Sequence, residues 1–215
     1  MSKPYTAGDL STQLTEDRTW RIREISDLKA IISRADSIGQ RVLLRALVTI
    51  CYAHWEGYVR FAARRYLEHI ALRRLTLSEL RRQFTRNYFL PRLASLAMSK
   101  GSFADRCSVV DEILDSGRKQ FSKLDLDLVN TRANLNFEVF LEICSVCDVS
   151  PTAFDEHASF IDVMLLKRRN AIAHGEDTFI ALDDLAVVTG TTIELMRQFG
   201  DALENSSTLK EYRVA

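Results

Sequence analysis

A long stretch without proline constrains the fold of this chain more than any other feature. It runs from Gln40 to Leu75 and reads QRVLLRALVTICYAHWEGYVRFAARRYLEHIALRRL. Apolar residues cover much of the helical circumference in its first half, and charged residues become frequent in the second. The stretch predicts a long central helix whose first half is buried on more than one side.

Apolar spacing predicts further helices in the first half of the chain. Residues 17–35 carry apolar side chains at three- and four-residue steps, which indicates an amphipathic first helix. After the central helix, Thr76 or Ser78 is a plausible N-cap, and Pro91 is expected to break the helix because proline disfavours helical geometry in the residue before it. One or two shorter helices are therefore expected there, followed by a less regular region over 101–136.

Three helical segments are expected in the second half. The first is NLNFEVFLEICSVC, residues 134–147, with a boundary at DVSP. The second spans 158–174, and Gly175 stands where a left-handed residue commonly ends a helix. The third begins at Asp183 or Asp184. The tails, about 1–12 and 206–215, are expected to fray.

No hairpin signal, internal repeat or low-complexity tract appears in the sequence. A length of 215 residues with 47% hydrophobic content fits one domain with a sizeable core. We therefore expect an all-α bundle of about five main helices in a single domain, 1–215.

Composition and cysteine usage favour a cytoplasmic protein. No apolar run reaches the roughly 18 residues of a membrane span, and the opening MSKPYTAGDL lacks the apolar core of a secretory signal. The four cysteines are too few and too unevenly placed for a disulfide scaffold. Cys144 and Cys147 form a CxxC without a second ligand pair, so we interpret them as small buried side chains and expect no metal or cofactor.

Charge is unevenly distributed although the formal net charge is zero. Nine arginines lie between Arg60 and Arg92 against Glu68 and Glu79, whereas Asp and Glu dominate residues 105–156. One interpretation is solvated helix faces paired with the acidic half. The other is a surface that contacts phosphates.

The segment YAHWEGYVR within the central helix combines unusual residues. His54 lies on an apolar face, whereas Glu56 belongs to a polar stripe that we define as Arg45, Thr49, Tyr52, Glu56 and Arg60. Gly57 costs about 1 kcal/mol in a helix relative to alanine, which suggests that another group approaches closely. A structural interpretation is a satisfied core histidine, an exposed Glu56–Arg60 pair and a tight helix crossing at Gly57.

The segment RRNAIAHGED, residues 168–177, has two interpretations. A histidine in the last turn and a following glycine are common at a helix end. That interpretation leaves the preceding RRN unexplained. Arg169 and His174 are five residues apart, about 140° around an ideal helix. The arginine must therefore wrap round, the helix end must distort, or the pair must line a cleft completed by another helix or chain.

RNAIAH resembles the Rx4-6H motif of the HEPN superfamily, all-α proteins whose active members are metal-independent endoribonucleases. YAHWEGYVRFAARRYL resembles a stand-alone bacterial branch of the superfamily, and the resemblance extends from about Arg18 to Phe199. It implies a helical bundle, a symmetric dimer with both motif copies in one cleft, and a toxin–antitoxin or phage-defence role. The implied partners are an RNA substrate, a second copy and a cognate antitoxin protein.

Carried over by position, the resemblance makes Arg169 and His174 the catalytic pair and Asn170 their polar companion. His54 and Glu56 belong to the branch's second motif. We expect contacts to RNA from Arg60, Arg64 and Arg168. Two alternatives remain: a catalytically silent HEPN-like module that binds a partner protein or a nucleotide, and an immunity or antitoxin protein.

Overall fold

The computed structural model describes residues 2–98, 102–122 and 124–214, and within these ranges the chain is helical without a strand. The predicted all-α class is confirmed. Two isolated bridges, Thr76–Gln120 and Leu80–Arg213, join loop segments. The α-helices are α1 (Ala7–Ile32), α2 (Ser37–Leu72), α3 (Arg82–Met98), α4 (Phe103–Leu114), α5 (Phe137–Cys147), α6 (Arg168–Ala173) and α7 (Asp184–Leu209).

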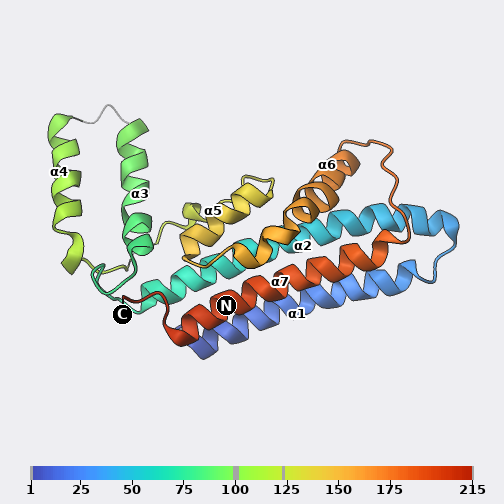
Figure 1. The fold of residues 1–215 in the computed structure, drawn as a ribbon, viewed down its shortest axis with the longest axis horizontal. Coiled ribbons are helices and arrows are strands. Elements are labelled where there is room, and N and C mark those ends of the chain that lie inside the picture. The colour runs from blue at the N-terminus through green and yellow to red at the C-terminus, as the bar shows by residue number, and fades with distance from the viewer. Residues whose placement is uncertain (1, 99–101, 123, 215) are drawn as a thin grey trace.

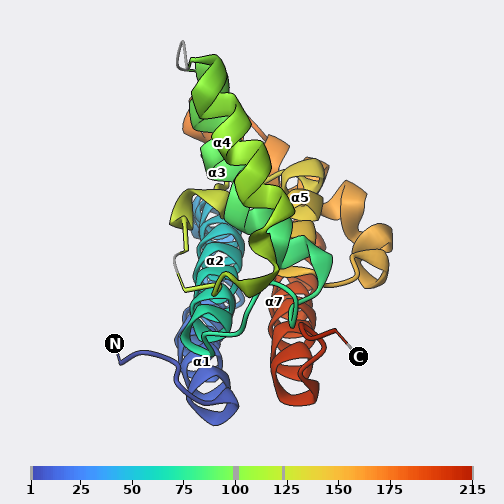
Figure 2. The same cartoon turned by 90° about the vertical axis from the view of Figure 1, so that its left-hand side faces the viewer.

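The long helices α1, α2 and α7 lie side by side and each contacts the other two (Figure 1). Helices α5 and α6 pack on the other side of α2, so α2 is the centre of the molecule, as its sequence predicts. Helices α3 and α4 form a pair that stands clear of the long helices at one end (Figure 2). The arrangement leaves α2 with one face available to α6 and the loops around it.

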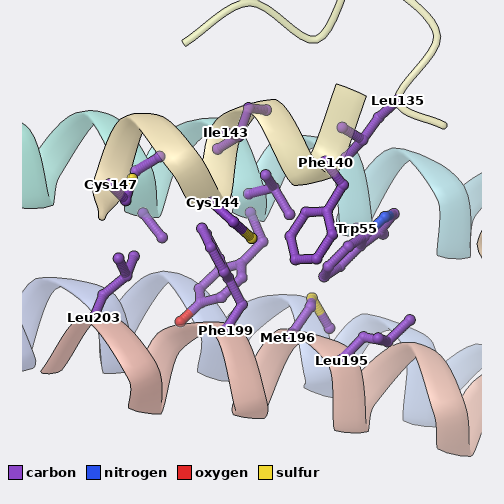
Figure 3. Packing of buried hydrophobic residues seen from close by; sticks show 14 of the residues in the cluster. Trp55, Leu135, Phe140, Ile143, Cys144, Cys147, Leu195, Met196, Phe199 and Leu203 are labelled. Atoms are coloured by element: carbon purple, nitrogen blue, oxygen red, sulfur yellow. The ribbon is translucent and has the colours of Figure 1, made fainter. Parts of the chain in front are cut away.

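The core forms where α2, α5 and α7 meet (Figure 3). Phe140 of α5 lies 5.0 Å from Trp55 of α2 and 5.4 Å from Phe199 of α7, measured between ring centroids. All three side chains are fully buried. Cys144 and Cys147 lie in the same layer, buried and free, which confirms the interpretation of the CxxC as core residues.

The expectation of a frayed N-terminal tail is wrong. Helix α1 begins at Ala7, well before Asp17, because Thr6 and Asp9 form a capping box in which each side chain binds the other's backbone N–H. Leu10, one turn later, is fully buried. Thr6 and Asp9 therefore start the helix within the segment that was expected to fray.

The C-terminal tail is also packed, contrary to expectation. Helix α7 continues to Leu209, and Tyr212 is buried beyond it. His69 of α2 holds both chain ends: its Nδ1 lies 2.9 Å from the Pro4 carbonyl oxygen and its Nε2 lies 3.0 Å from Ser207 Oγ. Burial lowers the pKa of His69, although the Pro4 carbonyl opposes that shift.

Two expectations about α3 are also wrong. Thr76 and Ser78 do not cap it, since Thr76 forms a turn with Glu79 and a bridge with Gln120, and the helix begins at Arg82. Pro91 lies inside α3 instead of breaking it. A proline removes one backbone hydrogen bond, and α3 packs against α4 and α5.

Candidate functional site

The segment expected as one regular helix over 158–174 changes its winding. A 3₁₀ segment, η3 (Thr152–His157), is followed by a π-helix, η4 (Phe160–Lys167), and only then by the short α6. The wider π turn shifts the faces of the residues that follow, and π turns are frequent at functional sites. The helix end that carries the RNAIAH motif therefore departs from ideal winding.

Helix α6 ends as its sequence predicts. His174 is the C-cap, and Gly175 has the left-handed conformation with φ of 79°. The Glu176 N–H donates to the Ala171 carbonyl at 2.9 Å, and the Gly175 N–H donates to the Ile172 carbonyl at 3.1 Å. These two bonds define a Schellman motif, which fixes the direction in which the chain leaves His174.

Arg169 is held against α2 by stacking and hydrogen bonds. Its Cζ lies 4.1 Å from the centroid of the Tyr52 ring. Its Nη2 donates to the Ala133 carbonyl at 3.1 Å and lies 3.5 Å from Asn134 Oδ1. Asn170 Nδ2 donates to the same Asn134 oxygen at 3.3 Å. The loop before α5 therefore positions two consecutive residues of the motif.

The same loop, residues 129–135, is tied to α2. Thr131 Oγ1 donates to Glu56 Oε1 at 2.6 Å, and the buried Leu135 N–H donates to the Tyr52 hydroxyl at 2.7 Å. Arg132 and Ala133 both adopt left-handed conformations, with φ of 52° and 57°. Side chains other than glycine are strained there, and such strain often accompanies functional sites.

An open cavity of about 520 Å³ lies where this loop, α2 and α6 meet. Arg169 forms part of its wall together with four members of the polar stripe. The stripe's remaining residue, Arg45, binds the chain beyond His174 by donating to the carbonyls of Glu176 at 2.8 Å and Thr178 at 3.0 Å. The lining residues are Thr49, Tyr52, Ala53, Glu56, Gly57, Arg60, Asn130, Thr131, Ala133 and Arg169.

His174 is exposed at the end of α6 and is absent from the wall of this cavity. Its imidazole makes no hydrogen bond or ion pair with any described residue of the chain, Arg169 included. The structure therefore joins Arg169, Asn170 and Glu56 to the same loop, and the His174 imidazole takes no part in their hydrogen bonds. Completion of a cleft by a second chain stays a prediction.

The three arginines expected to contact RNA differ in environment. Arg60 is exposed on the cavity wall, and Arg64 donates to the Val129 carbonyl at 3.3 Å. Arg168 instead forms an ion pair with Asp184 at 2.7 Å and does not line the cavity. No Glu56–Arg60 ion pair forms, since the Glu56 carboxylate binds Thr131. In the wider arginine segment Arg65, Arg81 and Arg92 are paired with Glu68, Asp148 and Glu112.

His54 is a core histidine, away from the cavity. It is buried, its Nε2 lies 2.8 Å from Glu24 Oε2, and its ring meets Trp20 edge to face. Burial lowers the pKa of His54, and the neighbouring Glu24 carboxylate opposes this shift. Of the two second-motif residues, only Glu56 is joined to the candidate site.

The expected close approach at Gly57 is confirmed, and the approaching group is a side chain. A Cβ at this position would lie 2.7 Å from Nη1 of Arg21. That arginine is fixed by Asp17, whose carboxylate accepts from Arg21 Nε at 2.6 Å. Arg21 also packs over the Trp20 ring at 4.6 Å.

Tyr52, Thr131 and Asn134 were not singled out as site residues from the sequence. Tyr52 belongs to the polar stripe, so its spacing on α2 was the available signal. Thr131 and Asn134 lie in an irregular loop without periodicity. Burial raises the pKa of Tyr52, and the Arg169 guanidinium opposes that shift.

An all-α HEPN-type module is the class that this fold and motif define. The family model for RiboL-PSP-HEPN matches residues 16–205, and the chain belongs to this HEPN-domain family. HEPN domains are commonly ribonucleases. No curated protein and no solved structure matches the chain. Among the described residues, no helix is long and apolar enough to span a membrane, and no cluster of His, Cys, Asp and Glu side chains could hold a metal ion.

Proposed function

We propose that the protein is a metal-independent endoribonuclease acting as a toxin or phage-defence effector. The observation that carries this proposal is the fixed position of Arg169. It lies on the wall of an open cavity, stacked on Tyr52 and bound to the 129–135 loop, with exposed Arg60 beside it. Exposed His174 at the end of the same short helix supplies a titratable group.

RNA carries its own nucleophile, the 2′-hydroxyl. In the proposed reaction the 2′-oxygen bonds to phosphorus, the bond from phosphorus to the 5′-oxygen breaks, and a 2′,3′-cyclic phosphate remains. His174 accepts the 2′-hydroxyl proton, a transfer that typically contributes about 10²- to 10⁴-fold. Arg169 stays charged and holds the phosphoryl oxygens as their negative charge grows.

The leaving 5′-oxygen needs a proton at the same time, and one histidine cannot easily serve both steps. An isologous dimer would supply His174 of the partner subunit as the acid. The exposure of His174 and the lack of a hydrogen bond between its imidazole and Arg169 support a pocket completed by a second copy. Asn170, bound to Asn134, would orient the phosphate or the imidazole.

The chemistry is tested by digesting RNA in excess chelator and identifying the product ends. We expect unimpaired cleavage, 2′,3′-cyclic phosphates and 5′-hydroxyl ends. A strict need for a divalent ion, or a simple 3′-hydroxyl end, contradicts the proposal. The dimer is tested by titrating inactive His174→Ala into wild type at constant wild-type concentration, because a site that needs a histidine from each subunit is inactive in every mixed dimer. Activity that does not fall as the variant is added contradicts the shared site.

A catalytically silent binding module is the second candidate. It is favoured by the hydrogen bonds that tie Arg169 to the 129–135 loop and that do not involve the His174 imidazole. It predicts RNA or partner binding without cleavage, and no growth arrest when the wild-type protein is expressed.

A further inference from the structure

A second, larger cavity adjoins the cavity of Arg169 along α2. Its volume is about 690 Å³, and it lies between α1, α2 and the segment around the 3₁₀ turn η2 (Leu126–Leu128). The two cavities share Gly57 and Arg60 in their walls. The second is lined by Arg21, Gly57, Arg60, Phe61, Arg64, Arg65, Glu68, Leu124 and Leu126.

The charge in this cavity is positive and only partly neutralised within the described chain. Arg21 is paired with Asp17, and Arg65 is paired with Glu68 at 2.7 Å. Arg60 and Arg64 have no carboxylate partner among the described residues, and they are four residues apart, so they share one face of α2.

The environment of Arg64 leaves part of its hydrogen-bonding capacity unused. Its Nη2 donates to the Val129 carbonyl, while its Nε is buried without a partner among the described residues. The carboxylates of Asp125 and Asp127 do not line the cavity. The Asp125 carboxylate accepts a hydrogen bond from the Asp127 N–H within its own turn. An anion entering the cavity would therefore meet two unpaired guanidinium groups.

Part of the wall is apolar. Phe61 projects from α2, with the Arg65 guanidinium 5.6 Å from its ring centroid, and Leu124 and Leu126 come from the facing segment. Leu126 is 46% exposed although it is apolar. A cationic edge with an aromatic and aliphatic wall is the surface that single-stranded nucleic acid prefers, since bases stack on the wall while phosphates meet the cations.

We propose that this cavity holds a flanking nucleotide of a single-stranded RNA substrate, with its phosphate on Arg60 and Arg64 and its base against Phe61, Leu124 and Leu126. The proposal rests on the proposed function, since the RNA in this cavity is the substrate of the adjoining Arg169 cavity. The two cavities are continuous because they share Gly57 and Arg60 in their walls. A base in a duplex is covered by its neighbours and its partner strand. The site therefore selects RNA that is unpaired beside the cleaved linkage.

Binding can be measured without cleavage. The probe is a short 5′-fluorescein-labelled 2′-O-methyl RNA, which lacks the nucleophilic hydroxyl, and fluorescence anisotropy gives Kd over a range of salt. Arg64→Gln should weaken binding and reduce the slope of log K against log salt by about 0.7, the value for one phosphate contact of a single strand. Leu126→Glu should weaken binding at least about fivefold, because it removes the apolar contact with the base and adds a negative charge beside the phosphate.

The matched control is Arg82→Gln on α3, which removes one exposed positive charge outside both cavities. Its Kd and salt slope should equal those of the wild type. Wild-type binding by both Arg64→Gln and Leu126→Glu overturns the inference, as does equal weakening by Arg82→Gln. Circular dichroism establishes that each variant is folded.

Competitors distinguish this site from others with similar chemistry. Free 5′-AMP that displaces the probe as effectively as unlabelled RNA overturns the substrate role in favour of a free-nucleotide site. Displacement by an oligoglutamate peptide overturns it in favour of an acidic protein partner. Failure of the proposed function is separable, because probe binding that depends on Arg64 and Leu126 without any RNA cleavage refutes the nuclease and retains the cavity.

Discussion

Removing the hydroxyl of Tyr52 isolates the connection between α2 and the loop that holds Arg169. In Tyr52→Phe the ring that stacks under the guanidinium remains. Only the oxygen that accepts the Leu135 N–H at 2.7 Å is lost. Tyr52 is 2% exposed and Leu135 is fully buried, so water cannot easily replace the missing acceptor.

The expected loss of stability follows from that burial. A buried N–H left without an acceptor costs about 1–3 kcal/mol. At about 2 kcal/mol, and with a urea slope of about 2 kcal/mol per molar, the midpoint of unfolding should fall by about 1 M. The slope itself should not change, because the surface exposed on unfolding is nearly the same.

Tyr58→Phe provides the matched control on the same helix. The Tyr58 side chain is fully buried, and its hydroxyl makes no hydrogen bond with any described residue. Its removal should change stability by less than about 0.5 kcal/mol or increase it. Urea unfolding followed by circular dichroism compares the two variants, and hydrogen exchange should show faster exchange at Leu135 in Tyr52→Phe alone. Equal destabilisation by both changes would refute the reasoning.

Three further changes test the core, the helix end and the buried histidine. Phe140→Ala should destabilise the protein by about 3–5 kcal/mol in urea unfolding, whereas Phe103→Ala, at a site 83% exposed, should stay within about 0.5 kcal/mol. Gly175→Ala, at φ of 79°, should cost about 1 kcal/mol and speed amide exchange at the end of α6; unchanged exchange would contradict the Schellman assignment. Burial lowers the pKa of His69, so protonation favours the unfolded chain and stability should fall as pH drops below about 6.5. His69→Gln should flatten this fall in the urea midpoint, and an unaltered pH profile would exclude that role.

The elements that sequence predicted well are those with strong local determinants. Apolar residues over a long run without proline predict helix α2. Gly175 after the last turn predicts the end of α6. The position of the CxxC in the core followed from the lack of further ligands. These features depend on residues a few positions apart, so they can be predicted from the sequence.

What sequence missed depends on contacts between distant segments. Asn134, which holds Arg169 and Asn170, lies in a loop whose conformation includes two strained residues and no periodic signal. Thr76 was a suitable cap by type, but its bridge to Gln120 fixes a turn there instead. The π-helix before α6 is likewise invisible in residue spacing, and it determines which way the motif faces.

The sequence therefore predicted part of the candidate site, namely Arg169, Asn170 and Glu56, but not the loop residues that hold them. Arg169, Asn170 and Glu56 all bind the 129–135 loop, and Arg169 and Glu56 also line one cavity. His54 shares a sequence segment with Glu56 and yet is buried against α1, where it contacts Glu24 and Trp20. Neighbouring positions on one helix thus serve different purposes, and only the packing of other elements against each face separates them.

The proposed nuclease requires Arg169 and His174 to act on the same RNA linkage in a cleft completed by a second copy of the chain. Its most direct test is the single-turnover rate of RNA cleavage in chelator for wild type, Arg169→Ala and His174→Ala at matched folded fraction. We expect a loss of at least about 100-fold in each variant. Cleavage at the wild-type rate by either variant would contradict it.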